Sequence, residues 1–337
     1  MSGRDIRRVV ARASVFPNAE KASMVLRLIA AAGTLGVERV LVSTDTVGVA
    51  AGVLRAYRRE RNQRATRWPD VEFVELERHA GTAADTAEHI RRMRVAGAGL
   101  IVLLGGDGTV RAAAPVLGDT PVLPLSTGTN NAFPQVWEAT VAGTAAALVV
   151  TGRLDADTTT DRAKVLTVRA GDTSELALVD VCISTLAHVG ARALWQVDSL
   201  REIYCAFAEP HAIGLSSVAG QLLPTSRTSD DGVAIRLGEP GDVAARTVLA
   251  PVAPGVLHEL QVADVRPLAA GDVVGTAVGS GTVAVDGERE IEFGPATAVT
   301  VELGTDGPRV LDVRRALQLA AAEQLLTATS RTAGEVH

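Results

Sequence analysis

From residue 8 to about residue 152, short runs of β-branched residues alternate with longer amphipathic stretches. Short apolar runs of this kind are typical of strands, and strands that alternate with helical patterns are typical of a parallel α/β sheet. The pattern predicts strands at Val9–Ala13, Arg39–Val42, Val71–Leu76, Leu100–Leu104 and Pro121–Leu125, with helices between them.

Two of the intervening helices carry start signals. Asn18 stands before a stretch whose apolar residues recur at helical spacing, so its side chain is suited either to cap that helix or to contact a ligand at the end of the first strand. Thr82-Ala83-Ala84-Asp85 resembles a capping box with Asp in place of Glu. We therefore expect helices to begin at these two places.

After residue 152 the rhythm changes to short β-like runs separated by turn signals, from Lys164–Val168 to Val310–Val313. This rhythm predicts a mostly antiparallel second domain, interrupted by a helix at about 191–208. The expected organisation is an α/β domain at 1–152, a β-rich domain at 153–312, and a helix with a frayed tail at 313–337, the helix itself ending near residue 326. The pattern leaves open that this last helix packs back on the first domain.

Composition is that of a folded, soluble protein, with 47% hydrophobic and 21% charged residues in 337. The formal net charge of -6 argues against a broad nucleic-acid surface. Cys182 and Cys205 stand apart from any metal-spaced cluster, and no apolar stretch suits a signal peptide or a membrane span. We expect a cytoplasmic protein that binds no nucleic acid and does not span a membrane, and the sequence leaves a homo-oligomer open.

Lysine is rare, since Lys21 and Lys164 are the only two. A P-loop needs G-x-x-x-x-G-K-[ST], and a protein kinase needs a lysine on its third strand. Neither lysine has such a context, so both of these ATP-site designs are excluded.

The first candidate site is a glycine loop that follows the strand at 100–104 and precedes a helical run at 110–117. Glycines at the carboxyl end of such a strand let backbone N–H groups approach a polyphosphate. Thr109 is suited to cap the helix or to contact phosphate, and a plain tight turn with positive φ is the alternative reading. The loop consists of Gly105, Gly106, Asp107, Gly108 and Thr109.

A second polar loop follows the next strand and should lie on the same sheet edge. Pro134 suits the first turn of a following helix, and Asn131 or its neighbours are suited to cap it. The density of polar residues beside the glycine loop favours a ligand role. The candidate ligand residues are Thr127, Gly128, Thr129, Asn130 and Asn131.

The two loops resemble the superfamily that joins NAD kinases, diacylglycerol kinases and sphingosine kinases, which a GGDGT loop defines. The string from Ser126 to Gln135, together with Thr82 and Asp85-Thr86, is most similar to the acetoin-catabolism X proteins. The resemblance covers nearly the whole chain. It implies an α/β nucleotide domain and a β domain with the active site between them.

The resemblance also implies roles for particular residues. Asp107 would belong to the phosphate and Mg²⁺ environment and would act as the base for the attacked hydroxyl, while the loop residues would hold the nucleotide. The Asn-Glu pair of NAD kinases is replaced by Val179-Asp180, which argues against NAD as the acceptor.

A second departure points towards lipid kinases. Val285-Asp286-Gly287-Glu288 resembles their D-G-E turn, in which an acidic group serves as base or metal-site partner. Alternating residues on both sides predict a hairpin, whose turn is either functional or a plain Asp-Gly turn with a solvated Glu. Asp286 and Glu288 are therefore the second pair of catalytic candidates, and no metal ligand is assigned.

The sequence predicts an ATP-dependent kinase that uses Mg²⁺ and phosphorylates a hydroxyl of a small, soluble acceptor. Phosphoryl transfer depends on positioning and electrostatics, which glycine-loop N–H groups and one carboxylate can provide. A diacylglycerol-kinase-like lipid kinase and a nucleotide-binding regulator without catalysis are the alternatives.

Overall fold

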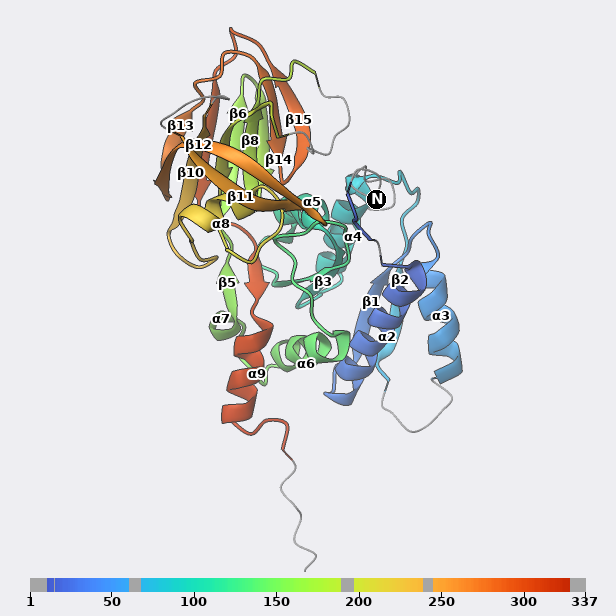
Figure 1. The fold of residues 1–337 in the computed structure, drawn as a ribbon. Helices are drawn as coiled ribbons and strands as arrows, with labels where there is room; N and C mark the ends of the chain where they lie inside the picture. Colours follow the sequence, from blue (N-terminus) through green and yellow to red (C-terminus); the bar gives the residue numbers. More distant parts are fainter. Residues whose placement is uncertain (1–10, 15, 61–67, 189–196, 239–244, 328–337) are drawn as a thin grey trace, which may run out of the picture.

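The computed structural model describes residues 11–14, 16–60, 68–188, 197–238 and 245–327. Figure 1 shows two layered parts, with the helices and parallel strands of the first half below and the β-sheets of the second half above. This is the expected class, an α/β N-terminal part followed by a mostly antiparallel β part.

Strands and helices alternate through the first half, and its strands pair in parallel, β1 with β2 and β3 with β4. Four of the five expected runs, those at 39–42, 71–76, 100–104 and 121–125, thus form strands within one or two residues of their expected positions, because each is bounded by polar or glycine residues. The elements are α2 (Asn18–Thr34), β1 (Arg39–Ser43), α3 (Val49–Glu60), β2 (Asp70–Val74), α4 (Ala83–Val95), β3 (Ile101–Gly105), α5 (Asp107–Leu117), β4 (Val122–Ser126) and α6 (Ala139–Val150).

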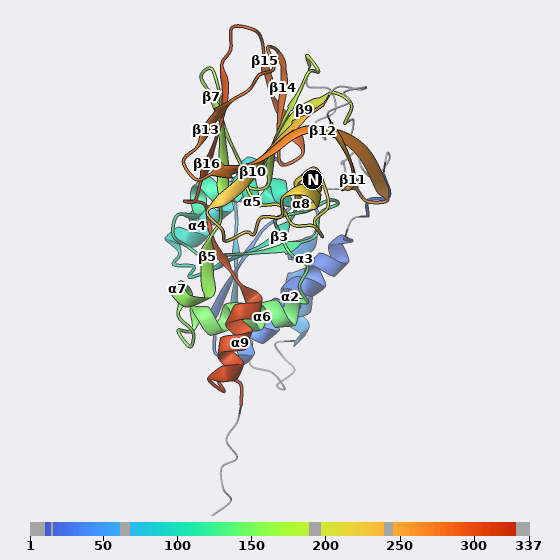
Figure 2. The ribbon, with the colours of Figure 1, turned by 60° about the vertical axis from the view of Figure 1, so that its left-hand side comes forward.

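The first half holds two separate sheets, β1-β2 and a second sheet that contains β3 and β4. The second of these takes in strands from the later part of the chain. Its order is β3-β4-β17-β5, in which β17 (Arg309–Leu311) runs parallel to β4 and β5 (Thr160–Arg162) runs antiparallel to β17. The last helix, α9 (Val313–Ala322), shares a buried apolar cluster with α6, and Figure 2 shows the two helices beside one another. The expected β-rich domain at 153–312 includes the residues of β5 and β17, although both strands belong to the sheet of β3 and β4. A short run of residues does not reveal which strand it pairs with.

The second half consists of two antiparallel sheets, ordered β11-β12-β10-β9-β8-β14-β15 and β13-β16-β6-β7. Buried residues of both sheets join those of β3 and α5 in one hydrophobic cluster, so the two parts share a core. The remaining elements are α7 (Ala156–Thr159), β6 (Val165–Ala170), β7 (Thr173–Ala177), β8 (Asp180–Ser184), β9 (Leu200–Cys205), α8 (Ser216–Leu222), β10 (Asp231–Leu237), β11 (Arg246–Ala253), β12 (Val256–Ala269), β13 (Val273–Gly275), β14 (Gly281–Val285), β15 (Glu288–Phe293) and β16 (Val299–Gly304).

Two expected elements are wrong where the structure describes them. The helix at 191–208 is replaced by β9, while residues 191–196 lie outside the described residues. β9 is central in its sheet and buried on both faces, so it lacks the alternation that marks a half-exposed strand. The expected strand at 9–13 is absent at residues 11–13, where the Arg12 N–H instead donates to Pro254 O at 2.9 Å.

The helix starts also differ in detail. Asn18 is the first residue of α2 rather than its cap, and its amide donates to Val47 O at 3.0 Å. Thr82 caps α4 by accepting from Ala84 N, but Asp85 accepts from the N–H groups of residues 80 and 81 instead of closing the box. Local spacing indicates that a cap exists but does not decide which N–H it serves.

Three other boundaries are corrected. Pro134 lies in a loop, because the next helix begins at Ala139 with the Glu138 carboxylate as its cap, so neither Pro134 nor Asn131 starts it. α5 begins at Asp107, three residues earlier than expected, which places Thr109 inside its first turn rather than at its cap. α9 ends at residue 322 rather than 326.

Candidate functional site

The first glycine loop joins β3 directly to α5. Gly106 is the N-cap of α5, with φ -112° and ψ -171°, and Asp107 is its first residue. None of the three loop glycines has a positive φ, so the tight-turn explanation for them fails. Close approach explains two of them: a Cβ on Gly105 would lie 2.4 Å from Thr109 Oγ1, and one on Gly106 would lie 2.5 Å from Asn131 Oδ1.

The second loop packs against the first. β3 and β4 pair through Gly105 opposite Ser126, and the Thr127 N–H donates to Gly105 O at 2.9 Å. Asn131 lies between the loops, because its amide donates to Ser126 Oγ at 2.8 Å and its Oδ1 fills the space beside Gly106. The carboxyl ends of the two strands therefore carry one continuous loop surface.

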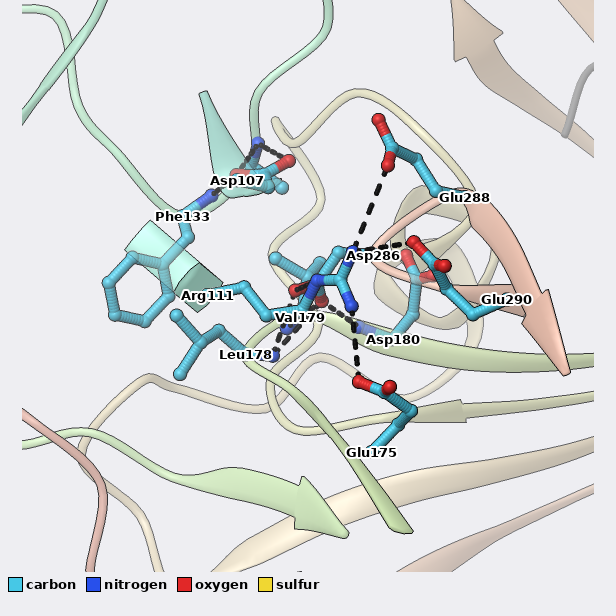
Figure 3. A network of polar contacts seen from close by, with 11 residues as sticks. Asp107, Arg111, Phe133, Glu175, Leu178, Val179, Asp180, Asp286, Glu288 and Glu290 are labelled. Atoms are coloured by element: carbon cyan, nitrogen blue, oxygen red, sulfur yellow. Dashed lines mark hydrogen bonds and ion pairs between the residues drawn. The ribbon is translucent and has the colours of Figure 1, made fainter. Parts of the chain in front are cut away.

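The Asp107 carboxylate fastens the two loops together (Figure 3). Its Oδ1 accepts from Phe133 N at 2.8 Å, and its two oxygens accept from Ala132 N at 3.2 and 3.1 Å. Asp107 also begins α5, where the aligned peptide dipoles favour negative charge. The candidate base is thus held in a fixed orientation at a helix N-terminus.

The D-G-E turn joins β14 to β15, as expected of a hairpin, and Asp286 has a φ of 48° there. The Asp286 side chain is buried, and its Oδ1 accepts from Leu178 N at 3.0 Å and from Val179 N at 2.8 Å. Burial raises the pKa of this carboxyl, while those N–H groups and the Arg111 guanidinium oppose the rise. Asp286 therefore anchors the turn to the backbone that leads into β8.

Arg111, one turn after Asp107 on α5, connects that helix to the β part (Figure 3). Burial lowers the pKa of its guanidinium, but the nearby carboxylates outweigh burial and hold this pKa above its ordinary value. Its side chain is only 15% exposed, so its ion pairs are largely shielded from water, unlike those at the surface. Its partners are Glu290 at 3.0 Å, Glu175 at 3.6 Å, and Asp286 and Glu288 at 3.8 Å each.

Glu288 is the more accessible acid of the turn, with a side chain that is 38% exposed. It lines the cleft that also contains the first glycine loop; residues of the first half form most of this cleft, and residues of the β part, Glu175 and Glu288 among them, form the rest. Each candidate catalytic or ligand residue from the sequence lines this cleft, namely Asn18, Gly105, Gly106, Asp107, Gly108, Thr109, Thr127, Gly128, Thr129, Asn130, Asn131, Asp286 and Glu288.

Asp180 is not marked as a site residue by the sequence, in which it stands out only as part of the Val179-Asp180 pair that replaces Asn-Glu. Its carboxyl is buried, and burial together with the charges of Asp286 and Asp107 raises its pKa to about 7, against a smaller lowering by Cys182 and the Gly287 N–H. A carboxyl in this environment carries its proton up to near-neutral pH. No local sequence signal marks it, because the two aspartates beside it come from distant elements.

Lys21 was noted only as a rare residue and belongs to the same cleft. It lies in the first turn of α2, and burial lowers the pKa of its ammonium. Within the described part of the chain its ammonium group makes no hydrogen bond or ion pair, so it is a cation available to an anionic ligand. Its rarity, one of two lysines in the chain, was the signal that could have marked it.

The cleft contains a helix N-terminus and carboxylates, the kinds of group that bind phosphates and Mg²⁺ in proteins. Over the described ranges no group of three or more His, Cys, Asp or Glu side chains is arranged to hold a metal. Mg²⁺ commonly takes one or two carboxylates together with substrate phosphates, and Asp107 and Glu288 are carboxylates of this cleft. A Cβ placed on Gly108 would have no atom within 4 Å, so there is open space beside the first turn of α5. A phosphate oxygen can approach the start of the helix through this space. No helix in the described residues is long and apolar enough to cross a membrane.

Two family models match successive parts of the chain. The ATP-NAD kinase N-terminal domain matches residues 10–154, and the acetoin catabolism protein X C-terminal domain matches residues 164–306. The first match supports a kinase-like, nucleotide-binding protein. β5 and β17, which join the sheet of β3 and β4, lie outside both matches: β5 lies between them and β17 follows the second.

Solved structures give more distant likenesses. Yeast NADH kinase complexed with NADH is 13% identical, with a TM-score of 0.47, covering 94% of this chain and 86% of that one. An NAD kinase from Archaeoglobus fulgidus in complex with ATP is 12% identical, with a TM-score of 0.34, covering 86% of this chain and 100% of that one.

A curated relative is much nearer in sequence. Acetoin catabolism protein X of Cupriavidus necator is 40% identical over 331 residues, which cover 97% of this chain and 91% of the relative. A likeness of this extent includes both parts of the fold and the cleft between them. The chain therefore belongs to the acetoin catabolism protein X family.

Proposed function

We propose that this protein is an ATP-dependent kinase that transfers phosphate to a hydroxyl of a small, soluble acceptor. One observation carries the proposal: two glycine-containing loops at adjacent strand ends and the D-G-E turn of the other part line the same cleft. Phosphoryl transfer needs this combination of a phosphate cradle and an acidic group on the acceptor side.

The donor side is formed by α5 and the loop before it. The N–H groups at the start of a helix attract phosphate oxygens, and the open space beside Gly108 allows such an oxygen to approach α5. Lys21 is a further cation on the same cleft. When bound, Mg²⁺ would be held by the phosphates together with the Asp107 or Glu288 carboxylate, and it would neutralise charge on the transferred group.

The acceptor side is formed by carboxylates. Asp107 is our first choice as the base, because two backbone N–H groups fix its orientation in the cleft beside the glycine loop. Glu288 is the second choice, because it is half-exposed on the cleft. The backbone bonds of Asp286 favour a role in holding the turn, so we rank it last.

A screen of hydroxyl acceptors with Mg²⁺-ATP tests the proposal. Purified protein is incubated with NAD, NADH, diacylglycerol in vesicles and small diols, and phosphorylated products are detected by mass spectrometry. We expect a small, soluble product. A phosphorylated lipid would support the alternative that the D-G-E turn suggests, and tight ATP binding with no product from any acceptor class would support a non-catalytic regulator.

Gly108→Ala tests the phosphate cradle. The new Cβ meets no atom within 4 Å and the backbone is unstrained, so the fold should be kept. The methyl group would stand where a phosphate approaches, and we expect ATP affinity in calorimetric titration to fall by about tenfold, equivalent to about 1.4 kcal/mol. Gly279→Ala is the matched control, because its Cβ also meets open space and Gly279 does not line the cleft. Equal affinity in the two variants would contradict the cradle.

Glu288→Gln tests the acceptor side. The substitution keeps size and removes the charge, so turnover on the acceptor found in the screen should fall by on the order of tenfold or more while the Kd for ATP changes by less than about threefold. Glu259→Gln, at an exposed position of β12, is the control and should behave like the wild type. If Glu288→Gln weakens ATP binding as much as turnover, Glu288 belongs to the donor side.

The raised pKa of Asp180 predicts a pH dependence of stability. Its carboxyl has a pKa of about 7 in the folded protein against 3.8 in the unfolded chain, so between these values only the folded state keeps the proton. The free energy of unfolding should therefore fall as pH rises from about 4 to about 7, by up to about 1.4 kcal/mol per pH unit, and then level off.

Urea unfolding of the wild type and of Asp180→Asn at several pH values measures this contribution. The neutral amide cannot titrate, so the stability difference between the two proteins should change with pH over that interval and become constant above it. Parallel curves over the whole interval would show that Asp180 is ionised in the folded state.

A further inference from the structure

Arg227 lies between the two parts, in the turn between α8 and β10, and reaches the second loop. Its Nη1 donates to Phe133 O at 2.8 Å and its Nη2 donates to Ala132 O at 2.5 Å. These are the same two residues whose N–H groups bind the Asp107 carboxylate. The Ala132 carbonyl and the Phe133 N–H belong to one peptide unit, which is therefore held at its N–H by Asp107 and at its oxygen by Arg227.

The guanidinium is itself held rigidly. Its Nε and Nη2 donate to the two carboxylate oxygens of Glu209 at 3.0 and 2.9 Å, a forked geometry that fixes the plane of the group. That plane lies over the Phe207 ring, 4.2 Å from its centroid. With the two carbonyl contacts, four of the five N–H donors of Arg227 are in use.

The segments that carry this pair are fastened as well. Ala208 and Thr225 exchange two backbone hydrogen bonds of 2.9 Å, which join the chain beside Glu209 to the chain beside Arg227. The buried Lys164 ammonium donates to Ser226 O at 2.8 Å. Arg227 thus reaches the second loop from a rigid base in the β part.

We propose that Arg227 is a positioning residue for Asp107. By holding the Ala132 carbonyl, it fixes the peptide unit whose N–H, that of Phe133, points at the carboxylate, and the bond to the Phe133 carbonyl holds the same segment from its other side. The catalytic meaning of this role rests on the proposed function, in which Asp107 takes the acceptor proton. The mechanical link from Arg227 to Asp107 does not.

Arg227→Lys tests the link. An ammonium keeps the charge but cannot serve two carbonyls and both oxygens of Glu209 in one plane. We expect the amides of Ala132 and Phe133 to exchange with solvent at least tenfold faster, as measured by NMR, with the urea midpoint close to that of the wild type. Turnover should fall at least tenfold while the Kd for ATP changes less than threefold, a split that a general loss of stability would not produce.

Two further variants make the result decisive. Arg169→Lys, in an ion pair with Glu302 between β6 and β16, is the control and should leave all three quantities unchanged. If Arg227→Lys does not fold, Glu209→Gln weakens the same support from the other partner and should speed exchange at the same two amides. Unchanged exchange at Ala132 and Phe133 in a folded variant would overturn the proposal. If the wild type phosphorylates no acceptor, faster exchange still establishes the link, and only the proposed function fails.

Discussion

The site depends on the hydrogen bonds that the Asp107 carboxylate accepts from Ala132 and Phe133 N–H. β3 and β4 deliver two loops to the same sheet edge, and the second loop buries Ala132 and Phe133 in the shared hydrophobic cluster. The carboxylate at the start of α5 fixes the backbone of these two residues to the first loop. The open face beside Gly108 and the surface of the second loop are consequences of the resulting geometry.

Ion pairs and hydrogen bonds position the carboxylates that the β part contributes to the cleft. Burying several carboxylates together is costly unless cations or N–H groups compensate them. Arg111 serves four carboxylates at once, and backbone N–H groups serve Asp286. Asp180 receives little compensation, which is why its pKa rises to about 7. The two parts of the molecule are thereby joined through α5, the helix that also starts the proposed phosphate site.

Most strands and helices of the first half could be predicted from the sequence, but most of the residues that hold the site's side chains in place could not. The strands at 100–104 and 121–125 were recognisable because short apolar runs end at glycine or polar residues, and the GGDGT loop followed directly. β9 was missed because a strand buried on both faces does not alternate. Asp286 and Glu288 are neighbours in one motif, yet one is buried against backbone and the other is open to the cleft, a difference that only the packing of β8 beside the turn decides. Arg111 and Arg227 carry no local signal in a chain in which nearly every basic residue is arginine.

Asp107→Asn is the measurement that tests this account most directly. The amide keeps one oxygen for the N–H groups of the second loop but cannot take a proton from an acceptor hydroxyl. With the acceptor that the wild type phosphorylates, we expect turnover to fall by on the order of 10² to 10⁴, the range for loss of a positioned acid-base group, while the protein stays folded and binds ATP. Near-normal turnover in a folded Asp107→Asn protein would contradict the central role given to this carboxylate.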